Sequence, residues 1–208
     1  MTIPNQPVPA PPPPLPTAVY RPRASSPWHQ AACIALTGLL YISLLAPVSY
    51  LLTPTGGWLV LYIVVGAAVL GLGAMARALG WRSGWTALAQ LGLVLLIVEL
   101  VAAWDRAWLG FIPNGAVIEQ MGDLATSLGR SFLMEIAPLE PDRAALAFVA
   151  LAGGMLAWAF DWYVFTVKAP AATGLFALLV VFVAVALVRD TMPMWPLVLV
   201  LLAYFALL

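Results

Sequence analysis

The sequence predicts an all-α protein: a polytopic bundle of about six transmembrane helices, with one amphipathic helix outside the membrane. Three observations lead to this prediction. Apolar residues make up 63% of the chain and charged residues only 9%, and the mean hydropathy is +0.99. The apolar residues are gathered in runs close to the ~20 residues that a helix needs to cross a bilayer. No run alternates between polar and apolar residues as the strands of a membrane β-barrel do.

Charged or turn-forming residues separate the apolar runs. The sequence Thr53-Pro54-Thr55-Gly56-Gly57 ends the first run, and the turn at 80–84 follows the second. We therefore predict a membrane domain at 29–208 with an outer loop at 105–143. Its six spans cover about 31–52, 58–76, 85–104, 144–167, 171–188 and 194–208.

The N-terminal segment 1–28 differs from the rest in composition. Its first 20 residues contain eight prolines and few apolar anchors, so they cannot build a core and favour extended polyproline II conformations. We predict a disordered, proline-rich cytoplasmic tail. The apolar run that follows it is longer than the ~7–15 residues typical of a signal peptide, so we expect it to stay in the mature protein.

Basic residues in short loops predict the orientation, because cytoplasmic flanks of membrane helices are enriched in Lys and Arg. With the N-terminus inside, the predicted cytoplasmic side carries basic residues and no acid, while the other basic residues lie outside among acids. The predicted cytoplasmic set is Arg21, Arg23, Arg77, Arg82 and Lys168.

The outer loop contains an amphipathic helical pattern. Apolar residues recur there at helical spacing, with polar residues on the other side. Asn114 is a candidate N-cap, and Pro138 is expected to end the helix. The helix is expected either to lie at the outer interface or to cap the bundle, and its apolar stripe is a possible docking surface for a partner. The stripe consists of Val117, Met121, Leu124, Leu128 and Phe132.

Two acidic residues lie within predicted spans, Glu99 in the third and Asp161 in the fourth. A carboxylate inside a membrane is costly unless it is paired or wetted, so each is a candidate functional residue. The two lie toward opposite sides of the membrane and cannot form one site. Each carboxylate either forms a structural ion pair or binds an ion or substrate, and both roles are open. The basic residues that could pair with Glu99 are Arg189 and Arg143. Those that could pair with Asp161 are Arg77 and Lys168.

Other candidate chemistry is sparse. His29 and Cys33 are four residues apart on one helical face, but an apolar position disfavours a thiolate and no third residue orients the imidazole. One His and one Cys leave a zinc site two ligands short, so we predict no metal site and no cofactor. The formal net charge is zero, which argues against a nucleic-acid partner and leaves the lipid bilayer as the expected one.

Pairs of small residues four apart predict where helices approach closely. Such pairs are Ala67 with Gly71 in the second span, and Ala150 with Gly154 and Gly153 with Ala157 in the fourth.

Several phrases of the sequence resemble one family. The phrases "MARALGWRSGW", "LAQLGLVLLIVEL", "IPNGAVIEQMGDLATSLG" and "VKAPAATGLFAL" are similar to the N-terminal membrane domain of actinobacterial TgpA-type transglutaminase-like proteins. The resemblance implies a multi-pass protein of the bacterial plasma membrane that precedes an extracytoplasmic transglutaminase-like domain. The chain is expected to be truncated before that domain. The family's Cys-His-Asp triad matches no residues here, so no catalytic residue is predicted.

The leading hypothesis is therefore a non-catalytic membrane platform that anchors and positions a transglutaminase-like domain. The first alternative is a small transporter or channel component that uses Glu99 or Asp161. The third hypothesis is a membrane-embedded enzyme that acts on lipid. Three acidic residues of the outer segment could serve as its bases: Glu119, Asp123 and Glu135.

Overall fold

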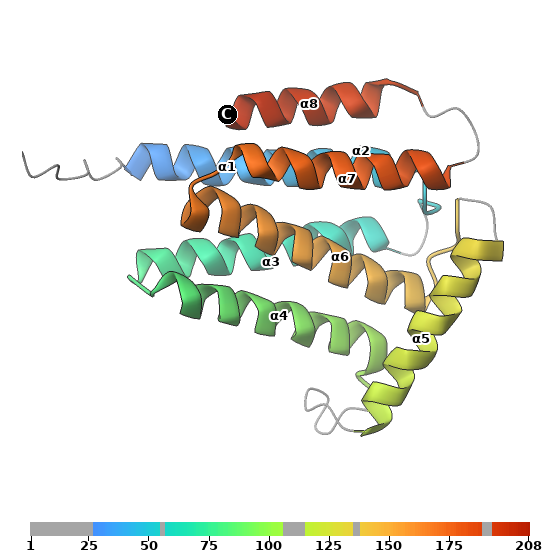
Figure 1. Ribbon diagram of the computed structural model, residues 1–208. Coiled ribbons are helices and arrows are strands. Elements are labelled where there is room, and N and C mark those ends of the chain that lie inside the picture. The colour runs from blue at the N-terminus through green and yellow to red at the C-terminus, as the bar shows by residue number, and fades with distance from the viewer. Residues whose placement is uncertain (1–26, 55–56, 106–114, 135–137, 189–192) are drawn as a thin grey trace, which may run out of the picture.

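A computed structural model of the chain describes residues 27–54, 57–105, 115–134, 138–188 and 193–208 (Figure 1). The predicted all-α fold is confirmed: the described ranges contain no β-strand, only an isolated bridge between Leu52 and Leu139. Most of the predicted tail at 1–28 lies outside the described residues. The helices are α1 (Pro27–Ser43), α2 (Leu45–Val48), α3 (Trp58–Ala78), α4 (Ser83–Ala103), α5 (Gly115–Met134), α6 (Arg143–Asp161), the π-helical η1 (Trp162–Val167), α7 (Ala171–Leu187) and α8 (Trp195–Leu207).

Four helical stretches are long and apolar enough to cross a membrane. They are Trp28–Val48, Trp58–Ala78, Ser83–Ala103 and Arg143–Val167. The predicted fifth and sixth spans correspond to the apolar helices α7 and α8, which have only 17 and 13 residues. Six spans therefore remain a prediction, because these two helices are shorter than the ~20 residues that a perpendicular crossing requires.

Helix α6 is the centre of the bundle. It packs against both α3 and α4, with which it makes its most extensive contacts, and it also touches α1, α5 and α7 (Figure 1). Helix α8 lies beside α1 on the opposite side of the bundle from α4. Helix α5 crosses the other helices steeply, at the end where α4 finishes and α6 begins.

The turn between α3 and α4 is formed by a glycine that ends α3. Gly80 has a φ of 74°, a left-handed conformation that other residues adopt at a cost. Its N–H donates to the carbonyl of Arg77, and the N–H of Trp81 donates to the carbonyl of Ala76. These two bonds form a Schellman motif, which satisfies carbonyls that the helix end leaves without partners. The turn places Arg77 in the last turn of α3, beside the start of α4.

At the opposite end, short backbone contacts connect the segments before α3 and α6. Leu139 donates its N–H to the carbonyl of Leu51 at 2.8 Å and accepts from the N–H of Thr53 at 2.9 Å. Asp142 then caps α6, since its carboxylate accepts the N–H of Ala145 at 2.7 Å. These contacts fix where α6 enters the bundle.

A tyrosine pair joins α1 to α3 and α6. The rings of Tyr41 and Tyr62 stack with centroids 4.3 Å apart, and each hydroxyl donates to the other residue's backbone carbonyl, at 2.9 and 3.1 Å. Gly66 and Gly153 give the rings room: a Cβ on either glycine would collide with Tyr41. Neither tyrosine hydroxyl is left buried without a partner.

The small-residue prediction is confirmed for α6 and wrong for α3. Gly154 packs so closely that a Cβ there would lie 2.8 Å from Val94 of α4, and Ala150 and Ala157 are fully buried. In α3, however, Gly71 has open space around it. The buried glycines of α3 are Gly66 and Gly73, seven residues apart, because a helix presents the same face again after about two turns.

Candidate functional site

Asp161 forms an ion pair in the interior of the bundle. It is the last residue of α6, and its side chain is only 4% exposed. Nη1 of Arg77 donates to both carboxylate oxygens, at 2.9 and 2.7 Å. Arg77 was one of the two partners expected for Asp161 from the sequence. The pair joins the ends of α3 and α6, two helices that are far apart in the chain.

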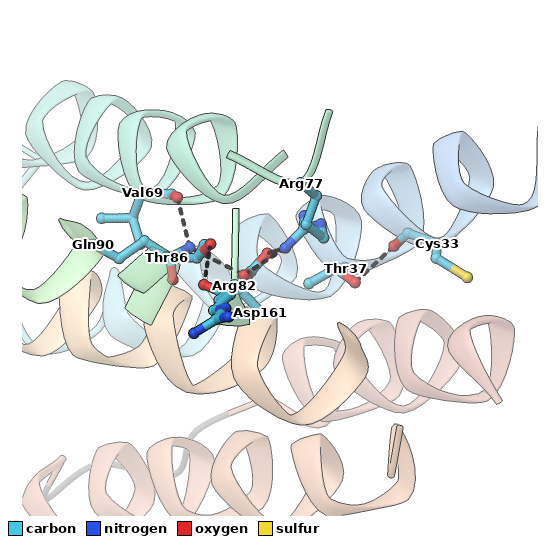
Figure 2. A network of polar contacts seen from close by, with 8 residues as sticks. All are labelled: Cys33, Thr37, Val69, Arg77, Arg82, Thr86, Gln90 and Asp161. Atoms are coloured by element: carbon cyan, nitrogen blue, oxygen red, sulfur yellow. Dashed lines mark hydrogen bonds and ion pairs between the residues drawn. The ribbon is translucent and has the colours of Figure 1, made fainter. Parts of the chain in front are cut away.

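Gln90 extends this pair to a third helix, α4. Its side chain is 1% exposed, and Nε2 donates to Oδ2 of Asp161 at 3.1 Å and to the backbone carbonyl of Val69 at 3.0 Å (Figure 2). Both amide hydrogens are therefore used, one on a carboxylate and one on a carbonyl of α3. The amide orientation follows from these bonds, because its oxygen cannot donate to either acceptor. Arg77, Gln90 and Asp161 constitute what we term the inner polar cluster.

Gly73 provides the space for the inner polar cluster. A Cβ built on this residue would collide with Nε2 of Gln90 and would lie 2.7 Å from Oδ2 of Asp161. Both atoms belong to short, buried side chains that are held by hydrogen bonds and cannot simply move away. We infer that the close approach of α3 to α4 and α6 at this level depends on the absence of a side chain at position 73.

The π-helical segment η1 follows Asp161 directly and completes the surroundings of Arg77. The guanidinium carbon of Arg77 lies 3.9 Å from the centroid of the Phe165 ring, a cation–π contact. Lys168, with a φ of 57°, then ends the segment. Nη2 of Arg77 is buried and has no hydrogen-bond partner in the described part of the chain. The side chain of Arg77 is 29% exposed, because it extends toward the end of the bundle.

This geometry favours a structural role for Asp161. The carboxylate receives three hydrogen bonds, from Arg77 and Gln90, and such a carboxylate is an acceptor whose capacity is largely filled. A buried ion pair contributes little net stability compared with an apolar pair, but it binds specific helix ends to each other because loss of one partner leaves the other charge uncompensated. Sequence reasoning identified Asp161 and Arg77 and missed Gln90 and Gly73.

Glu99 differs from Asp161. It lies near the end of α4 and is 6% exposed, and its Oε1 is buried without a hydrogen-bond partner among the described residues. Of the two partners expected from the sequence, Arg143 instead pairs with Asp105 at 3.0 Å, on the surface. Arg189 lies outside the described residues.

The predicted amphipathic helix is confirmed as α5, and its apolar stripe faces the bundle. Val117 is 1% exposed and packs with Ala102 and Ala103 of α4. Met121 and Leu128 pack on the main core, and a cavity of about 170 Å³ lies between this stripe, α4 and α6. Leu124 packs with the Val117 group. The side chain of Phe132 lies outside the described part. These contacts do not test whether a partner protein also binds the stripe.

The remaining candidates lie at the start of α1. His29 is exposed and Cys33 is half-buried, and the carbonyl of Cys33 accepts the hydroxyl of Thr37 at 2.7 Å. Within the ranges that the structure covers, no group of three or more His, Cys, Asp or Glu side chains is placed to hold a metal ion.

Together these observations define an all-helical domain with several membrane-compatible helices and an internal polar cluster that joins three of them. The family model of the TgpA N-terminal domain matches residues 18–208, so the chain belongs to this family. The resemblance drawn from the sequence phrases is thereby confirmed. No curated protein and no solved structure matches the chain.

Proposed function

We propose that this domain is a non-catalytic platform in the bacterial plasma membrane that anchors and positions an extracytoplasmic transglutaminase-like domain. The observation that carries the proposal is the hydrogen bonding of the Asp161 carboxylate inside the bundle. The Asp161 carboxylate is committed to Arg77 and Gln90, which suits a rigid support better than a reacting centre. Family membership supports the partner, because the resemblance to TgpA-type proteins implies a transglutaminase-like domain that follows this membrane domain.

The two ends of the bundle differ in charge, which supports the proposed orientation. Arg77, Arg82 and Lys168 lie at the ends of α3, α4 and η1 that meet around the inner polar cluster, and no acidic residue lies in the loops there. Helix α5 lies at the opposite end (Figure 1). With cytoplasmic basic loops, α5 lies on the extracytoplasmic side, where the proposed partner domain would be.

Helix α5 is the part of the chain that we propose the partner contacts. Its apolar stripe packs on the bundle, so its other face is presented outward, with Glu119, Asp123 and Arg130 exposed. Ile118 is 70% exposed on this helix. In the proposed contact, Ile118 would form the apolar centre and the charged groups its polar rim.

The test is co-purification of this chain with a separately expressed transglutaminase-like domain of the family. We expect Ile118→Asp to reduce retention of that domain at micromolar concentration. Ser83→Asp, an exposed substitution at the opposite end of the bundle, is the matched control and should leave retention unchanged. Retention that is equal for wild type and Ile118→Asp, with α5 still folded, would exclude this surface of α5 as the contact.

The alternative function, ion transport, now depends on Glu99, because the carboxylate of Asp161 is already paired. Glu99 is a buried acid without a partner among the described residues, and such groups mark ion pathways in membrane proteins. Ion flux in proteoliposomes that is abolished by Glu99→Gln would favour this function over the platform.

A further inference from the structure

An open cavity lies at the turn between α3 and α4, at the end of the bundle opposite α5 (Figure 1). Its volume is about 330 Å³, and it is lined by Trp81, Arg82 and Trp85. The two tryptophans are 49% and 64% exposed, and Arg82 is exposed as well. The proposed platform function assigns no role to these three residues.

The guanidinium of Arg82 is a positive charge without a partner. It forms no ion pair and no side-chain hydrogen bond within the residues that the structure describes. The indole N–H groups of Trp81 and Trp85 have no acceptor there either. Guanidinium and indole groups can donate hydrogen bonds but not accept them. The polar side-chain atoms that line the cavity are therefore all donors, which suits an anion.

The sequence provides no acidic residue to neutralise Arg82. It contains no acid before Glu99, and Asp161 is already bound by Arg77 and Gln90. The remaining acids occur between the end of α4 and the start of α6, and after the end of α7. These helix ends lie at the opposite end of the bundle (Figure 1). The surface around the cavity is therefore positively charged.

The position of the cavity along α4 places it at a membrane surface. Helix α4 is one of the helices long and apolar enough to cross a bilayer, and Arg82 directly precedes its first residue. Tryptophan is enriched at this level, because its ring is apolar and its N–H is polar. An arginine at this level meets the lipid phosphates, and its planar guanidinium forms paired hydrogen bonds with phosphate oxygens.

We propose that the cavity of Trp81, Arg82 and Trp85 binds the headgroup phosphate of an anionic phospholipid. The guanidinium donates to the phosphate oxygens, and the indole rings contact the glycerol backbone and the first part of the acyl chains. One unpaired guanidinium matches the single negative charge of a phosphatidylglycerol headgroup. A zwitterionic headgroup is disfavoured, because its ammonium group would face a positively charged surface. The site requires neither a partner domain nor a particular orientation of the chain in the membrane.

Thermal unfolding of the purified chain in detergent micelles, at constant ionic strength, tests the site. The micelles contain increasing fractions of phosphatidylglycerol or of phosphatidylcholine with the same acyl chains. We expect phosphatidylglycerol to raise the unfolding midpoint more, and in a saturable manner, because a ligand that binds only the folded state stabilises it. Arg82→Gln should raise its half-maximal fraction by roughly tenfold, the effect of losing a hydrogen bond between charged groups. Equal responses of the wild type to the two lipids would overturn the proposal.

The matched control is Lys168→Gln, which removes a positive charge from the same end of the bundle at an exposed position outside the cavity. Its response to phosphatidylglycerol should equal that of wild type. Equal losses in Lys168→Gln and Arg82→Gln would mean that this end attracts anionic lipid only through its overall charge, as any basic membrane surface does. That result would also overturn the proposal.

The contribution of the aromatic side chains is tested in the same assay. Trp85→Leu should weaken the response to phosphatidylglycerol, because the indole ring and its N–H are both lost. Trp104→Leu is the control, since Trp104 is 60% exposed directly after the other end of α4. A response reduced equally in both variants would contradict a site at the cavity.

Inorganic phosphate distinguishes a lipid from a soluble ligand. Added to lipid-free micelles, it lacks the glycerol and acyl chains that the indole rings contact, and it should leave the unfolding midpoint unchanged. Stabilisation by inorganic phosphate equal to that by phosphatidylglycerol would exclude lipid as the specific ligand.

Native mass spectrometry of the wild-type protein keeps the test decisive if Arg82→Gln fails to fold. From micelles that contain both lipids in equal amounts, the chain should retain phosphatidylglycerol in preference to phosphatidylcholine. Retention without preference would overturn the site, while the platform proposal, which rests on other residues, would stand.

Discussion

At the scale of single residues, the inner polar cluster combines a buried acceptor with a partly exposed donor. Asp161 is almost completely buried, whereas the side chain of Arg77 is 29% exposed. The loss of the carboxylate charge would leave a guanidinium that can still reach solvent or headgroups at the end of the bundle. The pair is therefore intermediate between a surface ion pair and a fully buried one, and its removal should have an intermediate effect.

Asp161→Asn is expected to lower the free energy of unfolding by about 1–3 kcal/mol, less than the full loss for a completely buried pair. The substitution keeps the size of the side chain but removes the charge that holds Arg77. Unfolding in mixed detergent measures the change. Asp105→Asn is the control, because the pair of Asp105 with Arg143 is about 45% exposed and should contribute at most about 1 kcal/mol. Equal effects of the two substitutions would contradict a structural role for Asp161.

Gly73→Ala is expected to destabilise the bundle by about 1–3 kcal/mol, because the added methyl group collides with Gln90 and Asp161 and over-packs the helix contact. Gly71→Ala on the same helix is the control. Position 71 has open space, so the change should be neutral or stabilise the helix by up to about 1 kcal/mol. Thermal unfolding of both variants tests the prediction, and a loss for Gly71→Ala as large as for Gly73→Ala would refute it.

At the scale of elements, the position of α5 depends on its packing against neighbouring helices. It contains Gly122 and Gly129, which weaken an isolated helix by about 1 kcal/mol each relative to alanine. Its apolar stripe compensates by lying on α4 and α6. The fit is incomplete, since a cavity of about 170 Å³ remains beneath the stripe.

Replacing Met121 and Leu128 together by Gln should detach α5 from the bundle. Both side chains are partly buried against the core, and their removal from an apolar contact costs about 2–4 kcal/mol in total. Limited proteolysis measures the effect as faster cleavage within 115–134. Thr126→Gln with Ser127→Gln, both exposed on α5, is the control. Loss of partner association without faster cleavage would instead mean that the stripe itself is the docking surface.

At the scale of the whole molecule, the outward surface of the bundle is apolar where a bilayer would surround it. Leu175, Phe182 and Phe205 of α7 and α8 are each at least 66% exposed. Large apolar surfaces of this kind are unusual in soluble monomers and fit contact with lipid or with further helices. We therefore expect such contacts at α7 and α8.

The proposed orientation predicts that the two ends of the bundle are labelled from opposite sides of intact cells. Cys33 is replaced by Ala first, because it is the single native thiol. Ser83→Cys at the start of α4 should then react only with a membrane-permeant reagent, and Ser127→Cys on α5 should also react with an impermeant one. Both serines are exposed, so access is limited by the membrane rather than by burial. Reaction of Ser83→Cys with the impermeant reagent would reverse the orientation.

The sequence by itself determined the fold class, the long apolar helices and the amphipathic α5. These properties depend on local composition and on a spacing of 3.6 residues, which are readable along a single chain. For the inner polar cluster, the sequence identified Asp161 and a short set of possible partners. It could do so because charged residues inside apolar runs are rare.

Only the tertiary structure decided which helix faces meet. Gln90 is an ordinary polar residue in the sequence and becomes part of the site only because α4 turns it toward Asp161. Gly71 and Gly73 are equivalent in composition, yet only Gly73 faces neighbouring helices. Arg143 was as suitable a partner for Glu99 as Arg77 was for Asp161, but the packing of α4 against α6 places it beside Asp105 instead. Which residues meet depends on how each helix is rotated about its axis. Contacts between distant segments determine this rotation, and the local sequence does not.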